Sequence, residues 1–175
     1  MKFISFNHDN SQKFGIIENN LITDLTGKID GALSLKELIK IKKIKEAKEY
    51  AKSNPGSIKP DEIKYSPLIP NPGKIICVGL NYSEHVKETN RTVEENPVIF
   101  HRFPESQTAH MQAIQRPTVS ESLDFEGEMA VVMDEGGKHI KPEDALKHIV
   151  GFSCYNESTI REWQRHTRQF GMGKN

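Results

Sequence analysis

The sequence has little that would mark a secreted, membrane-bound or nucleic-acid-binding protein. It has only two cysteines, Cys77 and Cys154, which lack CxxC spacing and lie in apolar segments, and this favours buried free thiols in a reducing compartment. Its 24 Lys and Arg balance 24 Asp and Glu, so charge gives no basis for nucleic acid or anionic lipid as the main partner. No apolar run approaches the roughly 20 residues of a membrane helix, and the N-terminus lacks a signal-peptide pattern. These absences predict a cytoplasmic globular protein that binds neither nucleic acid nor membrane.

The first third of the chain has the pattern of a small α+β unit. Residues 2–6 alternate like a short strand, and Asn19-Asn20 separates two further apolar segments as a tight hairpin turn would. Ser34 and Glu37 have capping-box spacing, which predicts a lysine-rich helix with a break near Ile41. Glutamates are interleaved with these lysines, which indicates a solvated helix face rather than a nucleic-acid surface.

A stretch rich in proline separates this unit from the rest of the chain. We therefore predict a small N-terminal domain with its linker at 1–70 and a second domain at 71–175. In the second domain, strands are expected at four apolar segments: 74–78, 97–100, 123–133 and 149–155. A short helix beginning at Pro142 and a final helix beginning at Ser158 complete an α+β fold.

The segment 123–133 carries three acidic residues at alternate positions. Side chains alternate across a strand, so Asp124, Glu126 and Glu128 are expected on one face. Neighbouring carboxylates repel one another unless a cation lies between them, and all-oxygen ligation selects Mg²⁺, Mn²⁺ or Ca²⁺. A solvated sheet face, or pairing with Arg and Lys, explains the same pattern without a metal.

A further carboxylate, Glu157, follows the strand expected at 149–155. Arg161 and Gln164 come four and seven positions later, so on a continuous helix all three would share one face. Glu157 could then supply a third carboxylate, with Arg161 and Gln164 reaching an anionic, oxygen-rich substrate. An ordinary Glu–Arg pair on a helix surface is the alternative.

His85 and Glu88 are three positions apart, within reach of each other in one helical turn. A carboxylate can orient a neutral histidine, which then acts as a general base on water. The alternative is a solvated pair on a surface helix.

Taken together, these segments resemble the fumarylacetoacetate hydrolase family. The resemblance covers most of the chain, in the order in which the family carries its motifs. The segments that carry it are 2–6 with Phe14-Gly15, Gly79-Leu80-Asn81-Tyr82 with His85 and Glu88, 97–100, 123–132, 151–156, 161–164 and Gly173-Lys174.

The resemblance implies the first part of a mixed β-sheet roll and a set of site residues. Glu126, Glu128 and Glu157 take the metal-ligand positions, and Glu157 stands where most members have Asp. The substrate-contacting positions are matched by Arg161, Gln164 and Lys174. His85 and Glu88 match a lid segment that activates water or moves a proton.

The implied chemistry is that of a small 2-oxo or 1,3-dioxo acid and its enolate, stabilised by Mg²⁺ or Mn²⁺, with Ca²⁺ possible. The simplest reaction is hydrolysis of a C–C bond in aromatic catabolism. The alternative reaction is isomerisation or hydration of acids of the 2-hydroxymuconate or 2-oxo-heptenedioate type. A homodimer is expected by family analogy.

Family members continue well beyond the position of Asn175, so we expect a catalytic domain that is incomplete at its C-terminus. An alternative of another class follows from this departure. The chain would be a non-catalytic fragment that only binds or dimerises through an exposed sheet edge.

Overall fold

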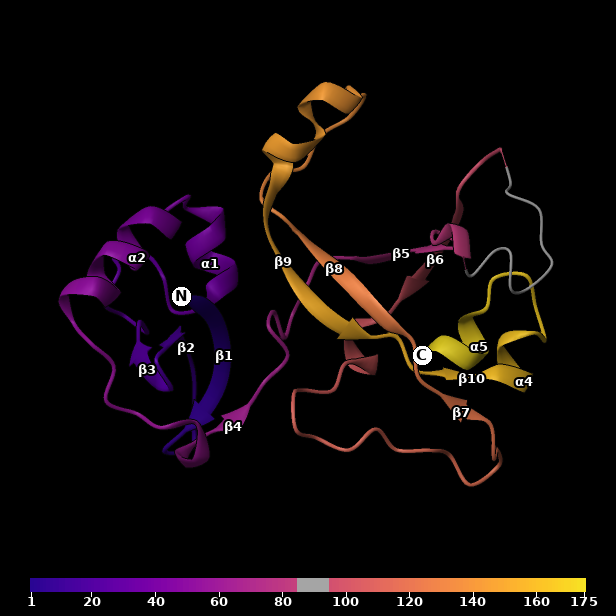
Figure 1. The fold of residues 1–175 in the computed structure, drawn as a ribbon, viewed down its shortest axis with the longest axis horizontal. Coiled ribbons are helices and arrows are strands. Elements are labelled where there is room, and N and C mark those ends of the chain that lie inside the picture. Colours follow the sequence, from indigo (N-terminus) through magenta and orange to yellow (C-terminus); the bar gives the residue numbers. More distant parts are fainter. Residues whose placement is uncertain (85–94) are drawn as a thin grey trace. The chain divides into compact units, whose positions relative to one another are not determined.

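The computed structural model describes residues 1–84 and 95–175, which form two compact units (Figure 1). The first unit consists of Met1–Pro70, Thr108–Ala113 and Gly127–Tyr155. The second unit consists of Asn71–Gln107, Ile114–Glu126 and Asn156–Asn175. The division into domains 1–70 and 71–175 stays a prediction.

The first unit contains a four-stranded sheet with the strand order β3-β2-β1-β4. Its strands are β1 (Lys2–His8), β2 (Ser11–Glu18), β3 (Leu21–Asp24) and β4 (Lys64–Tyr65). Asn19 and Asn20, with φ of 50° and 61°, connect β2 to β3 in the left-handed conformation that a two-residue hairpin turn requires. The predicted hairpin is therefore confirmed. Asp9 and Asn10 make a second turn of this kind between β1 and β2, which the sequence did not reveal.

Two helices, α1 (Leu35–Lys40) and α2 (Ile44–Ser53), lie between β3 and β4 in the chain. The Glu37 N–H donates to the Ser34 hydroxyl at 3.2 Å, so the predicted N-cap is confirmed. The predicted break is also confirmed, because α1 is capped at Ile41 and the next residue has a positive φ of 58°.

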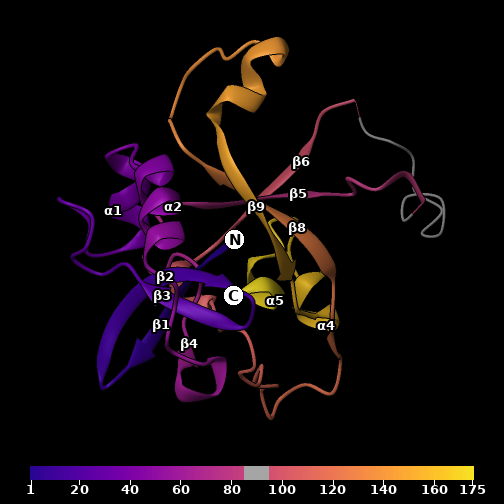
Figure 2. The ribbon, with the colours of Figure 1, turned by 60° about the vertical axis from the view of Figure 1, so that its left-hand side comes forward.

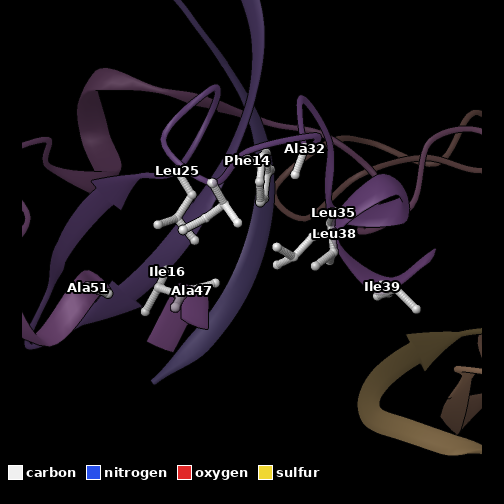
Figure 3. Packing of buried hydrophobic residues seen from close by; sticks show 10 residues of the cluster. Phe14, Ile16, Leu25, Ala32, Leu35, Leu38, Ile39, Ala47 and Ala51 are labelled. Carbon is white, nitrogen blue, oxygen red and sulfur yellow. The ribbon is translucent and has the colours of Figure 1, made fainter. Parts of the chain in front are cut away.

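Buried side chains from β2, from the loop after β3 and from both helices form the core of the first unit (Figure 3). The members of this cluster are Phe14, Ile16, Leu25, Ile29, Ala32, Leu35, Leu38, Ile39, Ala47 and Ala51. Phe14 and Leu38 are completely buried. Burial of apolar surface on this scale stabilises the unit independently of the candidate site.

A long ribbon of two strands, β8 (Gly127–Met133) and β9 (Ile149–Asn156), belongs largely to the first unit (Figures 1 and 2). A 3-10 helix, Pro142–His148, precedes β9 where the short helix was predicted. Val132 and Val150 pack against the hydrophobic core, whereas Met129 and Phe152 are exposed.

The single strand predicted at 123–133 is wrong. The structure divides it into β7 (Leu123–Asp124) and β8, with Phe125 and Glu126 between them outside any strand. β7 pairs with β10 (Thr159–Ile160), whereas β8 pairs with β9. An alternating pattern stays the same when a chain changes its pairing partner, so the sequence could not show this break.

In its described residues, the second unit has two small antiparallel sheets and the short helices α4 (Arg161–Gln164) and α5 (Gly171–Lys174). The strands are β5 (Ile75–Gly79), β6 (Val98–Arg102), β7 and β10 (Thr159–Ile160), and β5 pairs with β6 as β7 does with β10. The helices α4 and α5 lie side by side in both views (Figures 1 and 2). Two more 3-10 helices are Pro60–Glu62 in the first unit and Pro104–Ser106 in the second.

Three further predictions for the segment 71–175 are corrected. The helix predicted to begin at Ser158 begins at Arg161, because the two residues before Arg161 pair with β7, and it is followed by α5 (Gly171–Lys174). The uninterrupted apolar run at 74–78 is typical of a buried strand, but Ile76 on β5 is about half exposed. Both cysteines are free as predicted, but Cys77 is only partly buried and Cys154 is exposed.

No helix in residues 1–84 or 95–175 combines the length and the apolar character needed to cross a membrane.

The core predicts that truncating a buried leucine lowers the free energy of unfolding strongly, whereas truncating an exposed leucine has little effect. Leu38→Ala should lower the free energy of unfolding by about 2–5 kcal/mol, because Leu38 is completely buried. Leu33→Ala removes the same atoms from a side chain that is 66% exposed. This variant should change the free energy of unfolding by less than about 0.5 kcal/mol. Urea denaturation of the two variants and the wild type measures the difference, and equal midpoints would contradict the assigned core.

Candidate functional site

Three glutamates predicted as metal ligands come together in the structure. Glu126, Glu128 and Glu157 each offer a carboxylate oxygen, and these oxygens lie within 4.8 Å of one another. Such a group of hard oxygen donors suits a divalent ion such as Mg²⁺, Mn²⁺ or Ca²⁺. The structure therefore provides the convergence that the prediction required, and the ligand role itself stays a prediction.

Backbone pairing between two distant segments places Glu157 beside Glu126. The Glu157 N–H donates to the Glu126 carbonyl oxygen at 2.8 Å, and the Glu126 N–H donates to the Asn156 side-chain oxygen at 3.1 Å. In the adjoining β7–β10 pair, Thr159 is opposite Asp124. The two glutamates are thus aligned by a main-chain hydrogen bond and by the Asn156 side chain, before their own carboxylates interact with anything.

The ammonium group of Lys174 lies between two of the glutamates. Its Nζ atom is 2.9 Å from Glu126 Oε1 and 3.1 Å from Glu157 Oε2, and the Lys174 side chain is only 2% exposed. The Phe100 ring lies below this charge, with its centroid 5.1 Å from Nζ. Lys174 therefore compensates the negative charge of the buried Glu157 carboxylate and the partly buried Glu126 carboxylate.

Close packing of α5 against α4 fixes the backbone next to Lys174. A Cβ atom on Gly173 would lie 2.3 Å from the Gln164 backbone nitrogen and 2.5 Å from the Ile160 carbonyl oxygen. Only glycine fits at such a distance, so the Gly173-Lys174 pair predicted from the family motif has a steric basis.

Arg161 connects the cluster to a fourth carboxylate. Its Nε is 2.8 Å from Asp124 Oδ2, its Nη1 is 2.9 Å from Glu126 Oε1, and Nη1 also donates to the Gln164 side-chain oxygen at 3.2 Å. The structure thus brings Arg161 and Gln164 together at the site. The predicted helix face shared with Glu157 is wrong, because Glu157 precedes β10 and is not helical.

These neighbours favour the ionised forms of Glu126 and Asp124. Burial by itself would raise the pKa of Glu126, but hydrogen bonds from Lys174 and Thr159 and the charges of Lys174 and Arg161 outweigh it and lower that pKa. The hydrogen bond from Arg161 is the main cause of the lowered pKa of Asp124. A carboxylate must be deprotonated to bind a metal, so this environment favours cation binding at neutral pH.

One buried oxygen in the cluster has no hydrogen-bond donor. Within the described ranges, Glu157 Oε1 is buried and accepts no hydrogen bond, and Arg102 Nη1 lies 3.9 Å from it. An anionic oxygen that is buried without a donor is costly, and a cation would satisfy it. The residues present therefore fit a divalent ion.

Three residues of this network were not identified as site residues from the sequence. Thr159 and Arg102 belong to short strands whose partners only the fold reveals. Cys77 lies beside Glu157, and burial, followed by a hydrogen bond to that carboxylate, raises the pKa of its thiol to about 12. The thiol therefore stays protonated at neutral pH. His85 and Glu88, the predicted proton-transfer pair, lie outside the described residues.

The family model for "Fumarylacetoacetate (FAA) hydrolase C-terminal" matches residues 74–175. Among curated proteins, the chain is similar to the mitochondrial oxaloacetate tautomerase Fahd2a of Rattus norvegicus, with 39% identity over 65% of this chain and 36% of the relative. It is also similar to the oxaloacetate tautomerase YisK of Bacillus subtilis, with 38% identity over 65% of this chain and 39% of the relative. The chain thus spans less than half the length of either relative.

Solved structures give the same result for the fold. A fumarylacetoacetate hydrolase from Exiguobacterium antarcticum superposes with a TM-score of 0.83 at 29% identity, over 100% of this chain and 62% of that one. Maleylpyruvate hydrolase from Sphingobium sp. SYK-6, solved with manganese(II) and pyruvate, gives a TM-score of 0.76 over 99% of this chain and 63% of that one. At 17% identity the second likeness concerns the fold alone. The predicted α+β fold is confirmed.

The lowered pKa of Glu126 predicts how the stability of this site depends on pH. The pKa of Glu126 in the folded protein lies below the ordinary value of 4.5. The contribution of Glu126 to folding stability is therefore complete above pH 4.5 and is lost as the pH falls through the folded pKa. Glu126→Gln, which cannot ionise, should therefore be less stable than the wild type at pH 7, and this difference should shrink in acid. Denaturation curves from pH 7 to pH 3 test this, and a difference independent of pH would contradict it.

Proposed function

The chain belongs to the fumarylacetoacetate hydrolase family, and we propose that the protein is a metal-dependent enzyme acting on a small 2-oxo acid through its enolate. The convergence of Glu126, Glu128 and Glu157 supports this proposal most directly. A divalent ion bound there would act as a Lewis acid that polarises the oxygens of the substrate. We propose Mg²⁺ or Mn²⁺ for this role, because all three donors are carboxylates.

The positive groups beside the cluster have different parts in the proposal. Arg161 is 30% exposed, and its planar guanidinium suits a substrate carboxylate, with the Gln164 amide next to it. Lys174 is held on Glu126 and Glu157, where its charge offsets the negative charge of the site during the reaction. His85, oriented by Glu88, remains the residue that we propose to move the proton.

Relatives with 38–39% identity favour tautomerisation over the hydrolytic reaction expected first from the sequence. Both are named oxaloacetate tautomerases, which are isomerases. Tautomerisation moves a proton between the carbon next to the oxo group and its oxygen, so it requires a proton carrier and no water. We therefore propose a 2-oxo dicarboxylic acid of the oxaloacetate type as substrate, with C–C hydrolysis as the second candidate.

Two further proposals rest on analogy and composition. We propose a homodimer, as the family resemblance implies, and a cytoplasmic location for this chain. The rat relative is named mitochondrial, so at least one family member has a location other than the cytoplasm.

An assay with oxaloacetate tests the enzymatic proposal. Wild-type protein with Mg²⁺ or Mn²⁺ should accelerate the decay of the enol absorbance, and chelation of the metal should abolish the effect. Glu126→Gln should lower the rate by more than about 100-fold. Loss of a residue that only hydrogen-bonds to a metal ligand costs about 10–100-fold, and loss of the metal ligand itself should cost more. Glu121→Gln makes the same chemical change at an exposed glutamate of the same unit and should leave the rate unchanged.

The product mass separates the candidate reactions. Tautomerisation leaves the mass unchanged, hydration adds one water, and hydrolysis of an acylpyruvate yields two smaller acids. If no substrate of these classes is converted with either metal, the enzymatic proposal is wrong for this chain and the non-catalytic alternative is favoured.

A further inference from the structure

We propose that Thr159 is a positioning residue of the metal centre, whose hydroxyl fixes one oxygen of Glu126 so that the other oxygen is presented to the cation. This inference rests on the proposed function, because it assigns a task to Thr159 at the proposed metal site. Thr159 carries no charge and touches Glu126 rather than the proposed substrate position.

Two hydrogen-bond donors and one further cation converge on the same oxygen of Glu126. Thr159 Oγ1 donates to Glu126 Oε1 at 2.6 Å and Lys174 Nζ donates to it at 2.9 Å, while the Arg161 guanidinium forms an ion pair with it at 2.9 Å. A carboxylate oxygen has two lone pairs, so these two hydrogen bonds occupy both lone pairs of Oε1. The lone pairs of Oε2 are then the ones available to a cation, which makes Glu126 a ligand through a single oxygen.

Thr159 is the least adjustable of the three groups that contact this oxygen. Lys174 and Arg161 have long side chains and are shared with other carboxylates, Glu157 and Asp124 respectively. The Thr159 side chain is short and completely buried, and the pairing of β10 with β7 places Thr159 opposite Asp124, two positions before Glu126. Its position is therefore set by the backbone that also sets Glu126.

The Thr159 hydroxyl has one hydrogen and two acceptors within reach. Besides Glu126 Oε1 at 2.6 Å, the Glu157 carbonyl oxygen lies at 3.1 Å. The carboxylate is the nearer acceptor and carries a charge, so the hydrogen belongs to Glu126. Without this hydrogen bond the Glu126 carboxylate could rotate about its terminal bond and exchange the oxygen that faces the cation.

Binding of Mn²⁺ alone tests this role without any substrate. Thr159→Val replaces the hydroxyl by a methyl group of similar size, and it should weaken Mn²⁺ binding by about 10–100-fold, the usual cost of losing a partner that orients a ligand. Thr159→Ser keeps the hydroxyl and should bind Mn²⁺ close to the wild-type affinity. Isothermal titration calorimetry, or the electron paramagnetic resonance signal of free Mn²⁺, gives the dissociation constants.

A matched control lies in the first unit. Thr23 is also buried in a strand and donates its hydroxyl to the Asn54 carbonyl oxygen at 3.1 Å, so Thr23→Val makes the same change away from the carboxylates. It should leave Mn²⁺ affinity unchanged. Circular dichroism without metal shows which variants fold, and Thr159→Ala, which adds no methyl group, replaces the valine variant if that one does not fold.

The outcomes separate this inference from the proposed function. If the wild type binds Mn²⁺ and Thr159→Val or the folded alanine variant binds it equally well, the positioning role is wrong while the metal centre stands. If Thr159→Ser loses as much affinity as Thr159→Val, the hydroxyl is not the cause and the inference is again wrong. If the wild type binds no Mn²⁺, the metal centre and the role of Thr159 are both overturned.

Discussion

The ammonium group of Lys174 is the interaction on which the arrangement of the site depends. Glu157 is 6% exposed and Glu126 is partly buried, and two carboxylates this close repel each other strongly when water is excluded. Lys174 touches both, and its own burial is made possible by the two opposite charges. Removal of Lys174 would leave the two carboxylates without the positive charge that they share.

The remaining cations determine what else the cluster can bind. Arg161 forms ion pairs with Asp124 and, together with Lys174, with Glu126. Arg102 approaches Glu157 only to 3.9 Å and donates instead to the Ser158 carbonyl oxygen. The cations of the described part of the chain therefore allow the acids to be buried, but among these residues Glu157 Oε1 has no hydrogen-bond donor. A divalent ion would complete this balance, and its added charge would favour an anionic substrate.

Local signals in the sequence predicted the parts of the fold that depend on neighbouring residues. Asn19-Asn20 and the Ser34 cap act within a few positions, and both are confirmed. The division of 123–133 between two sheets was missed, because it depends on partners far along the chain. Thr159 was missed for the same reason: an uncharged residue in a two-residue strand becomes informative only when its pairing with β7 is known.

Glu157 shows how a departure from the family pattern is accommodated by this fold. The resemblance places Asp at this position in most members, and the additional methylene lengthens the reach of the carboxylate. In the structure Oε2 reaches Lys174 at 3.1 Å, while the backbone of Glu157 stays tied to Glu126 by a hydrogen bond of 2.8 Å. Because both ends of the residue are fixed, the longer side chain is taken up within the cluster. The three glutamates still converge within 4.8 Å, so the substitution preserves the charge and the donor set that the proposed chemistry needs.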